Sequence, residues 1–197
     1  MGEEIKSALE IAMEKVGKLG EVTEQERLRW KYVPEGERLA ASYLQGDCEL
    51  LSELGGYEEG VVGYVKRGAV EILINNIRLP RNEITKKSNR RAMEGLKNLK
   101  SDKVSVENVY SKIRHIFNHY LEQGAGQRKQ AYERLKSDFE AKMQEAIRQQ
   151  LGSVVGIKVN VEKQPQFQEE WRKLQAQLDL RYTTLLNEYK HELLAIP

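Results

Sequence analysis

The sequence predicts an all-α protein in which short helices precede a long helical hairpin. The first supporting observation is residues 104–150, which contain no proline and only two glycines, Gly124 and Gly126. The second is a narrow apolar seam that follows Pro165 and repeats at coiled-coil spacing. The third is a charged content of 31% against 40% hydrophobic residues, which favours elongated helices with much solvated surface.

The chain is expected to divide into two domains. Residues 1–103 are predicted to form a bundle of short helices that ends in a basic segment at residues 78–103. Residues 104–197 are predicted to form the hairpin, with a small β element near residues 154–162. A length of 197 residues is sufficient for one domain with a sizeable core, or for one small domain plus an extension.

Three helical segments are predicted before residue 46. The first, residues 3–18, is amphipathic. Its apolar side chains recur at helical spacing at Ile5, Leu9, Ala12, Met13 and Val16. In the second, Thr23 and Glu26 have the spacing of a capping box, which predicts a short helix. In the third, Pro34 suits the first turn of a separate helix, where the missing amide hydrogen of proline costs nothing.

Residues 55–68 are rich in glycine and permit two interpretations. One is a helix whose glycines allow close packing against a neighbour, although each glycine costs about 1 kcal/mol relative to alanine. The other is a β-hairpin of residues 61–65 and 70–74 that turns at Arg67 and Gly68. The helix is favoured, because helical apolar spacing continues beyond the glycines. The apolar residues at this spacing are Ala69, Ile72, Leu73 and Ile77.

Proline and capping signals set the next boundaries. Pro80 is expected to end the preceding helix, since proline disfavours helical backbone in the residue before it. A thin apolar stripe predicts a helix from about residue 83 to residue 99. Ser105 is the expected N-cap of the long helix that follows.

The apolar stripe of that long helix is interrupted in its middle. Before the interruption it includes Val109, Ile113, Ile116 and Tyr120. After the interruption it includes Tyr132, Leu135, Phe139, Met143 and Ile147. Gly124 and Gly126 lie between the two parts and predict either a bend in one helix or a junction between two.

The last helix, predicted from Pro165 to about Leu194, carries the clearest seam. Its members are Phe167, Trp171, Leu174, Leu178, Tyr182, Leu185 and Tyr189. About three heptads of this narrow spacing predict packing against another helix.

A strand signal separates the two long helices. Apolar and polar residues alternate over residues 157–161, and a lone strand must find a partner. That partner is residues 153–155, another segment of this chain, or the same segment of a second chain. The third option gives a symmetric homodimer. The candidate self-association residues are Ile157, Val159, Val161, Trp171 and Leu178.

Charge is unevenly distributed along the chain. The net charge is +2, but residues 1–60 carry 14 acidic and 7 basic residues, whereas residues 78–103 carry 9 basic and 3 acidic residues. The basic segment predicts either a solvated face, a face docked on the acidic N-terminal half of the chain, or a non-specific polyanion site such as one for nucleic acid. The candidate phosphate-contacting residues are Arg78, Arg81, Lys86, Lys87, Arg90, Arg91, Lys97 and Lys100.

Two histidines are the candidate metal ligands. His115 and His119 are four residues apart, which places both imidazoles on one helix face. A site needs a further ligand, and His191 approaches His115 if the two long helices are antiparallel. The alternative is a pair of surface histidines, and the glutamate that follows the first histidine in zincin helices is missing.

No other pattern indicates catalysis. The glycines at residues 55–68 match neither the dinucleotide fingerprint nor the phosphate loop, and Cys48 has no histidine nearby in sequence. We therefore expect no cofactor and no enzymatic activity. One cysteine forms no intrachain disulfide, no run approaches the roughly 20 apolar residues of a membrane span, and the start lacks a signal-peptide pattern. These features predict a cytoplasmic protein that does not associate with membranes.

Two segments resemble a small family of bacterial helical proteins with no assigned function. They are residues 6–15, KSALEIAMEK, and residues 76–82, NIRLPRN. The resemblance implies a mainly helical bacterial protein and supplies no catalytic residues. The function expected from the sequence is a non-catalytic interaction or scaffold protein that self-associates or binds another protein. The alternatives are nucleic-acid binding through residues 78–103 and a metal-dependent enzyme that uses His115 and His119.

Overall fold

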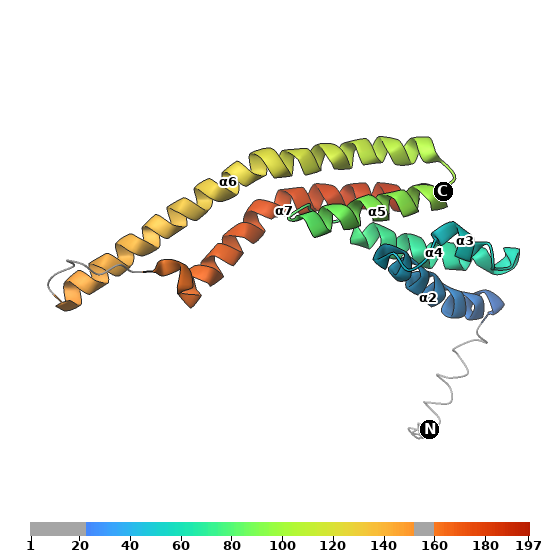
Figure 1. Cartoon of the computed structure of the whole chain (residues 1–197), viewed down its shortest axis with the longest axis horizontal. Helices are drawn as coiled ribbons and strands as arrows, with labels where there is room; N and C mark the ends of the chain where they lie inside the picture. Colours follow the sequence, from blue (N-terminus) through green and yellow to red (C-terminus); the bar gives the residue numbers. More distant parts are fainter. Residues whose placement is uncertain (1–22, 152–159) are drawn as a thin grey trace, which may run out of the picture. The chain divides into compact units, whose positions relative to one another are not determined.

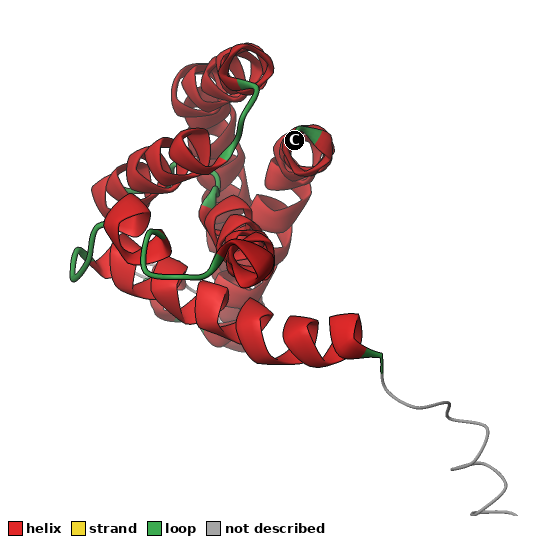
Figure 2. Ribbon diagram, turned by 90° about the vertical axis from the view of Figure 1, so that its right-hand side faces the viewer, coloured by secondary structure: helices red, strands yellow, loops and turns green. Residues whose placement is uncertain are grey.

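The computed structural model describes residues 23–151 and 160–197. Within these residues all regular secondary structure is helical, and Figure 2 shows only helices and loops there. The predicted all-α class is confirmed. The predicted helix at residues 3–18 and most of the predicted strand lie outside the described residues. Val161, at the end of that strand, instead begins the short 3₁₀ helix η1 (Val161–Lys163).

The chain divides into two compact units, residues 1–72 and residues 73–197. The described part of the first unit contains α2 (Glu24–Gln45), α3 (Leu50–Leu54) and most of α4 (Glu59–Asn76). The second unit contains α5 (Glu83–Leu99), α6 (Lys103–Leu151), η1 and α7 (Pro165–Ala195). The expectation that residues 1–103 and 104–197 fold as independent domains stays a prediction.

Helix α2 is one helix where the sequence predicts two. Its start follows the prediction, because the Thr23 hydroxyl accepts a hydrogen bond from the Glu26 amide and the Glu26 carboxylate accepts one from the Thr23 amide. Pro34, however, lies inside the helix rather than in the first turn of a second one. Proline inside a helix costs about 3 kcal/mol, so tertiary packing of the residues around it must offset that cost.

That packing is a reciprocal contact of two glycines between α2 and α4. A Cβ built on Gly36 would lie 1.9 Å from the Val65 carbonyl oxygen, and one built on Gly68 would lie 2.1 Å from the Val33 carbonyl oxygen. Each glycine therefore allows the backbone of the opposite helix to approach more closely than any side chain would permit. The helical interpretation is confirmed for Glu59–Asn76, where Gly68 allows the close packing, whereas residues 55–58 form a turn after α3. The hairpin is not formed.

The boundaries of α4 and α5 follow the sequence, whereas the start of α6 does not. Helix α4 ends at Asn76, before Pro80, and α5 covers the predicted residues 83–99. Helix α6 begins at Lys103, three residues earlier than a cap at Ser105 would place it. Asp102, not Ser105, is the capping residue, because its carboxylate accepts hydrogen bonds from the amide and the hydroxyl of Ser105.

Helix α6 is continuous through both of its glycines. Figure 1 shows that it changes direction near its middle, where its colour passes from yellow-green to yellow. Gly124 is buried there, and a Cβ on it would lie 3.0 Å from Arg128 Nη1 and 3.1 Å from the Tyr182 hydroxyl oxygen. The gap in the apolar stripe is therefore a place where α7 comes close to the backbone of α6.

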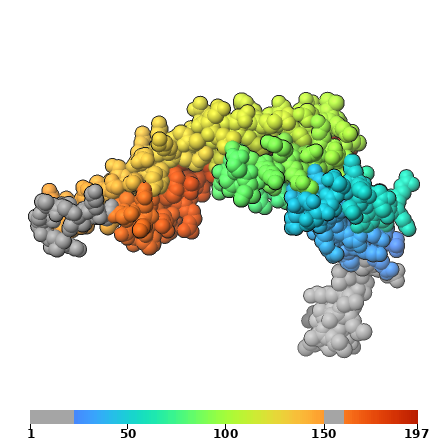
Figure 3. Space-filling view, in the orientation of Figure 1, coloured from blue at the N-terminus to red at the C-terminus, as the bar shows by residue number. Residues whose placement is uncertain are grey.

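Helices α6 and α7 form an antiparallel hairpin. At one end, the Ser101 amide donates to the Pro197 carbonyl, and Lys112 pairs with Glu192 at 2.8 Å. At the other end, Tyr132 contacts Phe167 and Trp171 edge to face. Figure 3 shows the orange part of α7 packed along the yellow and orange half of α6.

Candidate binding groove between α5 and α6

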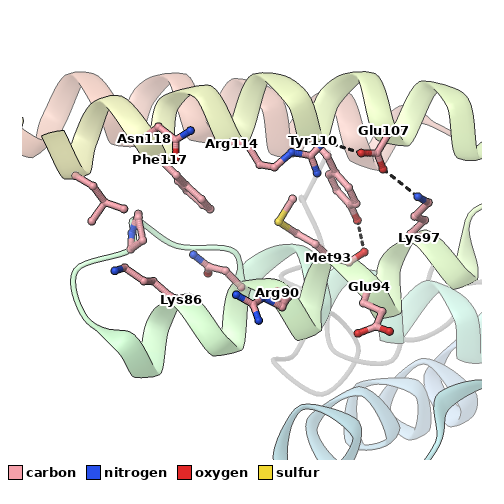
Figure 4. Close-up of a pocket in the computed structure, with 13 residues that line it drawn as sticks. Lys86, Arg90, Met93, Glu94, Lys97, Glu107, Tyr110, Arg114, Phe117 and Asn118 are labelled. Atoms are coloured by element: carbon pink, nitrogen blue, oxygen red, sulfur yellow. Dashed lines mark hydrogen bonds and ion pairs between the residues drawn. The ribbon is translucent and has the colours of Figure 1, made fainter. Parts of the chain in front are cut away.

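A groove of about 480 Å³ lies between α5 and the first half of α6. Both helices belong to the second compact unit. Figure 4 shows Met93 of α5 and Phe117 of α6 pointing into the space between the two helices. Pro80 and Leu121 complete the apolar lining. This lining is suited to apolar side chains of a bound molecule, since burying them removes apolar surface from water.

Tyr110 holds the two walls of the groove together. Its hydroxyl donates a 2.6 Å hydrogen bond to the Met93 carbonyl, and only 2% of the residue is exposed. Burial raises the pKa of Tyr110 well above its ordinary value. The phenol therefore stays protonated and acts as a fixed donor across the α5–α6 contact.

The rim of the groove is predominantly cationic. Four basic residues and two acidic residues line it, a net charge of +2. They are Lys86, Arg90, Lys97, Arg114, Glu94 and Glu107. An anionic partner that reaches this rim gains from electrostatic complementarity, mainly in orientation and in the rate of association.

Glu107 neutralises part of that rim. Its two carboxylate oxygens accept hydrogen bonds from Arg114 at 2.5 Å and from Lys97 at 3.0 Å. These bonds, that of Arg114 first, lower the pKa of Glu107 below its ordinary value. Lys86 pairs with the exposed Glu83, whereas Arg90 is exposed and forms no ion pair within the described residues. Arg90 is therefore the rim cation most available to a partner.

The structure separates the eight basic residues that the sequence groups together. Three of them, Lys86, Arg90 and Lys97, share the groove. Lys100 is buried, and its ammonium group donates to the carbonyls of Leu194 and Ile196 at the end of α7. The remaining four lie away from the groove. They are Arg78, Arg81, Lys87 and Arg91.

Arg81 belongs to an ionic cluster around the buried Asp179, and the sequence does not indicate this cluster. Its Nη2 atom lies 2.7 Å from Asp179 Oδ2, and the side chain of Asp179 is only 6% exposed. Arg128 Nη1 lies 3.6 Å from the other Asp179 oxygen, and Tyr120 donates to Asp179 at 3.3 Å. The sequence signal is the aspartate itself, which stands between Leu178 of the seam and Leu180.

The candidate metal ligands do not gather into a metal site in the described residues. His115 is exposed, and His119 Nδ1 lies 2.9 Å from the Tyr182 hydroxyl. Across residues 23–151 and 160–197, no three His, Cys, Asp or Glu side chains come close enough to hold a metal ion. The hypothesis of a metal-dependent enzyme therefore gains no third ligand from this part of the chain.

The predicted self-association residues fall into two groups. Ile157 and Val159 lie outside the described residues. Val161 is 1% exposed, while Trp171 is partly buried against Tyr132 and Leu178 is partly buried. Val161 and Trp171 therefore pack within the chain, and the role of all five residues between chains stays a prediction.

Most of the chain is similar to one protein family. Residues 51–195 match a family of unknown function, DUF6657. The chain belongs to this family. The predicted resemblance to a family without an assigned function is thereby confirmed, and the match includes α4 to α7, which carry the groove. No curated protein and no solved structure matches the chain. None of the helices in the described ranges is both long and apolar enough to cross a bilayer.

Proposed function

We propose that this is a non-catalytic interaction protein that self-associates, and that the groove between α5 and α6 is its docking surface. The observation that carries the proposal is the composition of the groove: apolar walls at Met93 and Phe117 within a rim of net charge +2. A surface of this kind fits an amphipathic helix with acidic residues beside its apolar face.

The sequence contains such a helix in its predicted segment at residues 3–18. Residues 1–22 carry five acidic and three basic side chains, a net charge of −2 that is opposite to the charge of the rim. The apolar positions Ile5, Leu9 and Val16 are separated by four and seven residues, the spacing of anchors in helix-in-groove recognition. We propose that this segment of a second copy is the occupant of the groove.

Light scattering of the full-length protein over a range of concentrations tests self-association. We expect a mass above 22.8 kDa that rises with concentration. Leu9→Glu should shift the protein to monomer, because it places a charge on the apolar face that the groove receives. Ser7→Glu is the matched control, since position 7 is on the opposite face of the predicted helix. A monomer at every concentration rejects the proposal.

Two variants of α5 test the groove itself. Arg90→Glu reverses a charge on the rim, and Lys87→Glu makes the same change at an exposed position outside the groove. We expect Arg90→Glu to weaken self-association and Lys87→Glu to leave it nearly unchanged. Equal effects of the two variants would show that only the net charge matters and that the groove is not the docking surface.

Nucleic-acid binding through residues 78–103 is the alternative function. It is favoured by the position of Lys86, Arg90 and Lys97 around one groove. Such binding would depend steeply on salt and would fall with either Arg90→Glu or Lys87→Glu, because phosphate contacts are not selective among surface cations. Titration of labelled RNA and DNA at several salt concentrations separates the two functions, and no binding at low salt removes this one.

A cytoplasmic location and a bacterial source accompany the proposal. The single cysteine, Cys48, is typical of a reducing compartment, and the resemblance at residues 6–15 and 76–82 is to bacterial proteins. Fractionation of cells that express the tagged protein tests the location, and recovery with the membranes would contradict it.

A further inference from the structure

A second pocket, of about 380 Å³, lies between the segment before α5 and the C-terminal half of α7. It is distinct from the groove, since no residue lines both. Its apolar side is formed by Ile77, Leu79 and Leu186, all of which are buried. Its polar side includes Arg78, Arg81 and Lys190, and no acidic residue of the described ranges lines it.

Two of these three cations have no counter-ion among the residues that the structure describes. Arg81 pairs with Asp179, whereas Arg78 and Lys190 form no ion pair with any described residue. Burial and the nearby charge of Arg78 lower the pKa of Lys190. Two like charges that approach each other in a pocket without a carboxylate are unfavourable to folding, and an anion between them would remove this repulsion.

The remaining polar groups also favour an anion. The amide of Asn187 lines the pocket and can donate a hydrogen bond. The hydroxyls of Thr85 and Thr183 already donate, to Asn82 Oδ1 and to the Asp179 carbonyl. Arg78, Lys190 and Asn187 are therefore the donors that a ligand would meet.

We propose that this pocket binds a phosphate monoester that carries a small apolar group. A phosphate monoester carries a charge of about −1.5 to −2 at neutral pH, which balances the charges of Arg78 and Lys190. The guanidinium group can hold two phosphate oxygens while the ammonium group acts as a point charge. The apolar group would lie on Ile77, Leu79 and Leu186. This site is independent of self-association through the groove.

Calorimetric titration of the full-length protein with phenyl phosphate and with inorganic phosphate tests the site. We expect phenyl phosphate to bind more tightly, because inorganic phosphate leaves the apolar side of the pocket uncovered. Arg78→Gln and Lys190→Gln should each weaken phenyl phosphate binding by about tenfold or more, since each removes one charge-assisted contact. Arg172→Gln, an exposed cation on α7 outside the pocket, should not change it.

Three outcomes would overturn the proposal. They are no binding by the wild-type protein at low salt, unchanged binding in both variants, and equal affinity for the two probes. A loss that occurs in Arg90→Gln but not in Arg78→Gln or Lys190→Gln would also overturn it, because the anion would then bind at α5. Circular dichroism should show that each variant keeps its helical content. Light scattering of Lys190→Gln should match the wild type, which separates this test from that of self-association.

Discussion

Arg81 and Asp179 are 98 residues apart in sequence, and Arg81 Nη2 lies 2.7 Å from Asp179 Oδ2. The arginine stands in the loop before α5, and the aspartate lies in the middle of α7. The side chain of Asp179 is buried, whereas that of Arg81 is 64% exposed. Asp179 is therefore the more constrained member of the pair. The pair ties the loop that enters α5 to the long hairpin of the second unit.

Asp179→Asn should lower the free energy of unfolding by about 3 kcal/mol, because it leaves the largely buried Arg128 without its counter-charge. Urea denaturation followed by circular dichroism measures this change. Asp138→Asn is the control, since it removes an exposed carboxylate of α6 and should change stability by less than about 0.5 kcal/mol. Equal stabilities of the two variants would contradict the assigned role of the cluster.

Gly68→Ala should destabilise the first unit by about 3 kcal/mol or more, since the new Cβ would overlap the Val33 carbonyl oxygen and force α2 and α4 apart. Gly63→Ala in the same helix is the matched control. A Cβ there meets no atom within 4 Å, so the substitution should stabilise the protein by up to about 1 kcal/mol. Thermal denaturation compares the two, and similar midpoints would show that the helices do not cross closely.

Tyr110→Phe should lower the free energy of unfolding by about 1 kcal/mol, because the Met93 carbonyl loses its hydrogen bond across the α5–α6 contact. Tyr189→Phe on α7 removes a hydroxyl from a partly buried tyrosine and should have a smaller effect. Chemical denaturation of both variants checks the prediction. An equal or larger loss in Tyr189→Phe would mean that the Tyr110 hydroxyl does not fix the groove.

Glu162 should give the attachment of η1 to α6 a dependence on acid pH. Hydrogen bonds from Lys136 and then from Tyr132 lower the pKa of Glu162 below its reference value of 4.5. The stabilisation is therefore present above pH 4.5 and is lost as the pH falls through the folded-state pKa.

The measurement is the difference in unfolding free energy between wild type and Glu162→Gln. That difference should shrink between about pH 6 and about pH 3. Glu188→Gln, at an exposed position of α7, should show no such trend. A constant difference for Glu162→Gln across this range would contradict the assigned pairing.

Local signals were sufficient to predict several elements. The helix at residues 83–99 and the capping box at Thr23 follow from periodicity and hydrogen-bonding chemistry within a few residues. The sequence predicts the start of α6 too late, because both Asp102 and Ser105 can cap a helix and only the bonded geometry distinguishes them. The sequence predicts a helix start at Pro34, whereas Pro34 lies inside α2. The packing of Gly36 against α4 offsets the cost of this proline, and that contact joins segments distant in sequence, so no local signal indicates it.

In the candidate sites, too, local sequence predicts some features, whereas contacts between distant segments decide others. Lys86, Arg90 and Lys97 recur at the four- and seven-residue spacing of one helix face, and they do share the groove. Local spacing did not indicate that Arg81 and Lys100, from the same basic segment, are engaged by Asp179 and by the end of α7. A charged side chain has the same appearance in sequence whether it faces water or a buried carboxylate.

By itself, the sequence determined that this chain is helical, where α5 and α7 begin and end, and that its two longest helices pair. Those properties arise from side-chain spacing and from bonds between residues close together in the chain. Only the tertiary structure decided which helices cross at Gly36 and Gly68, which charges are buried with Asp179, and which side chains line a groove. These depend on contacts between segments far apart in sequence, and no local pattern records the partner of such a contact.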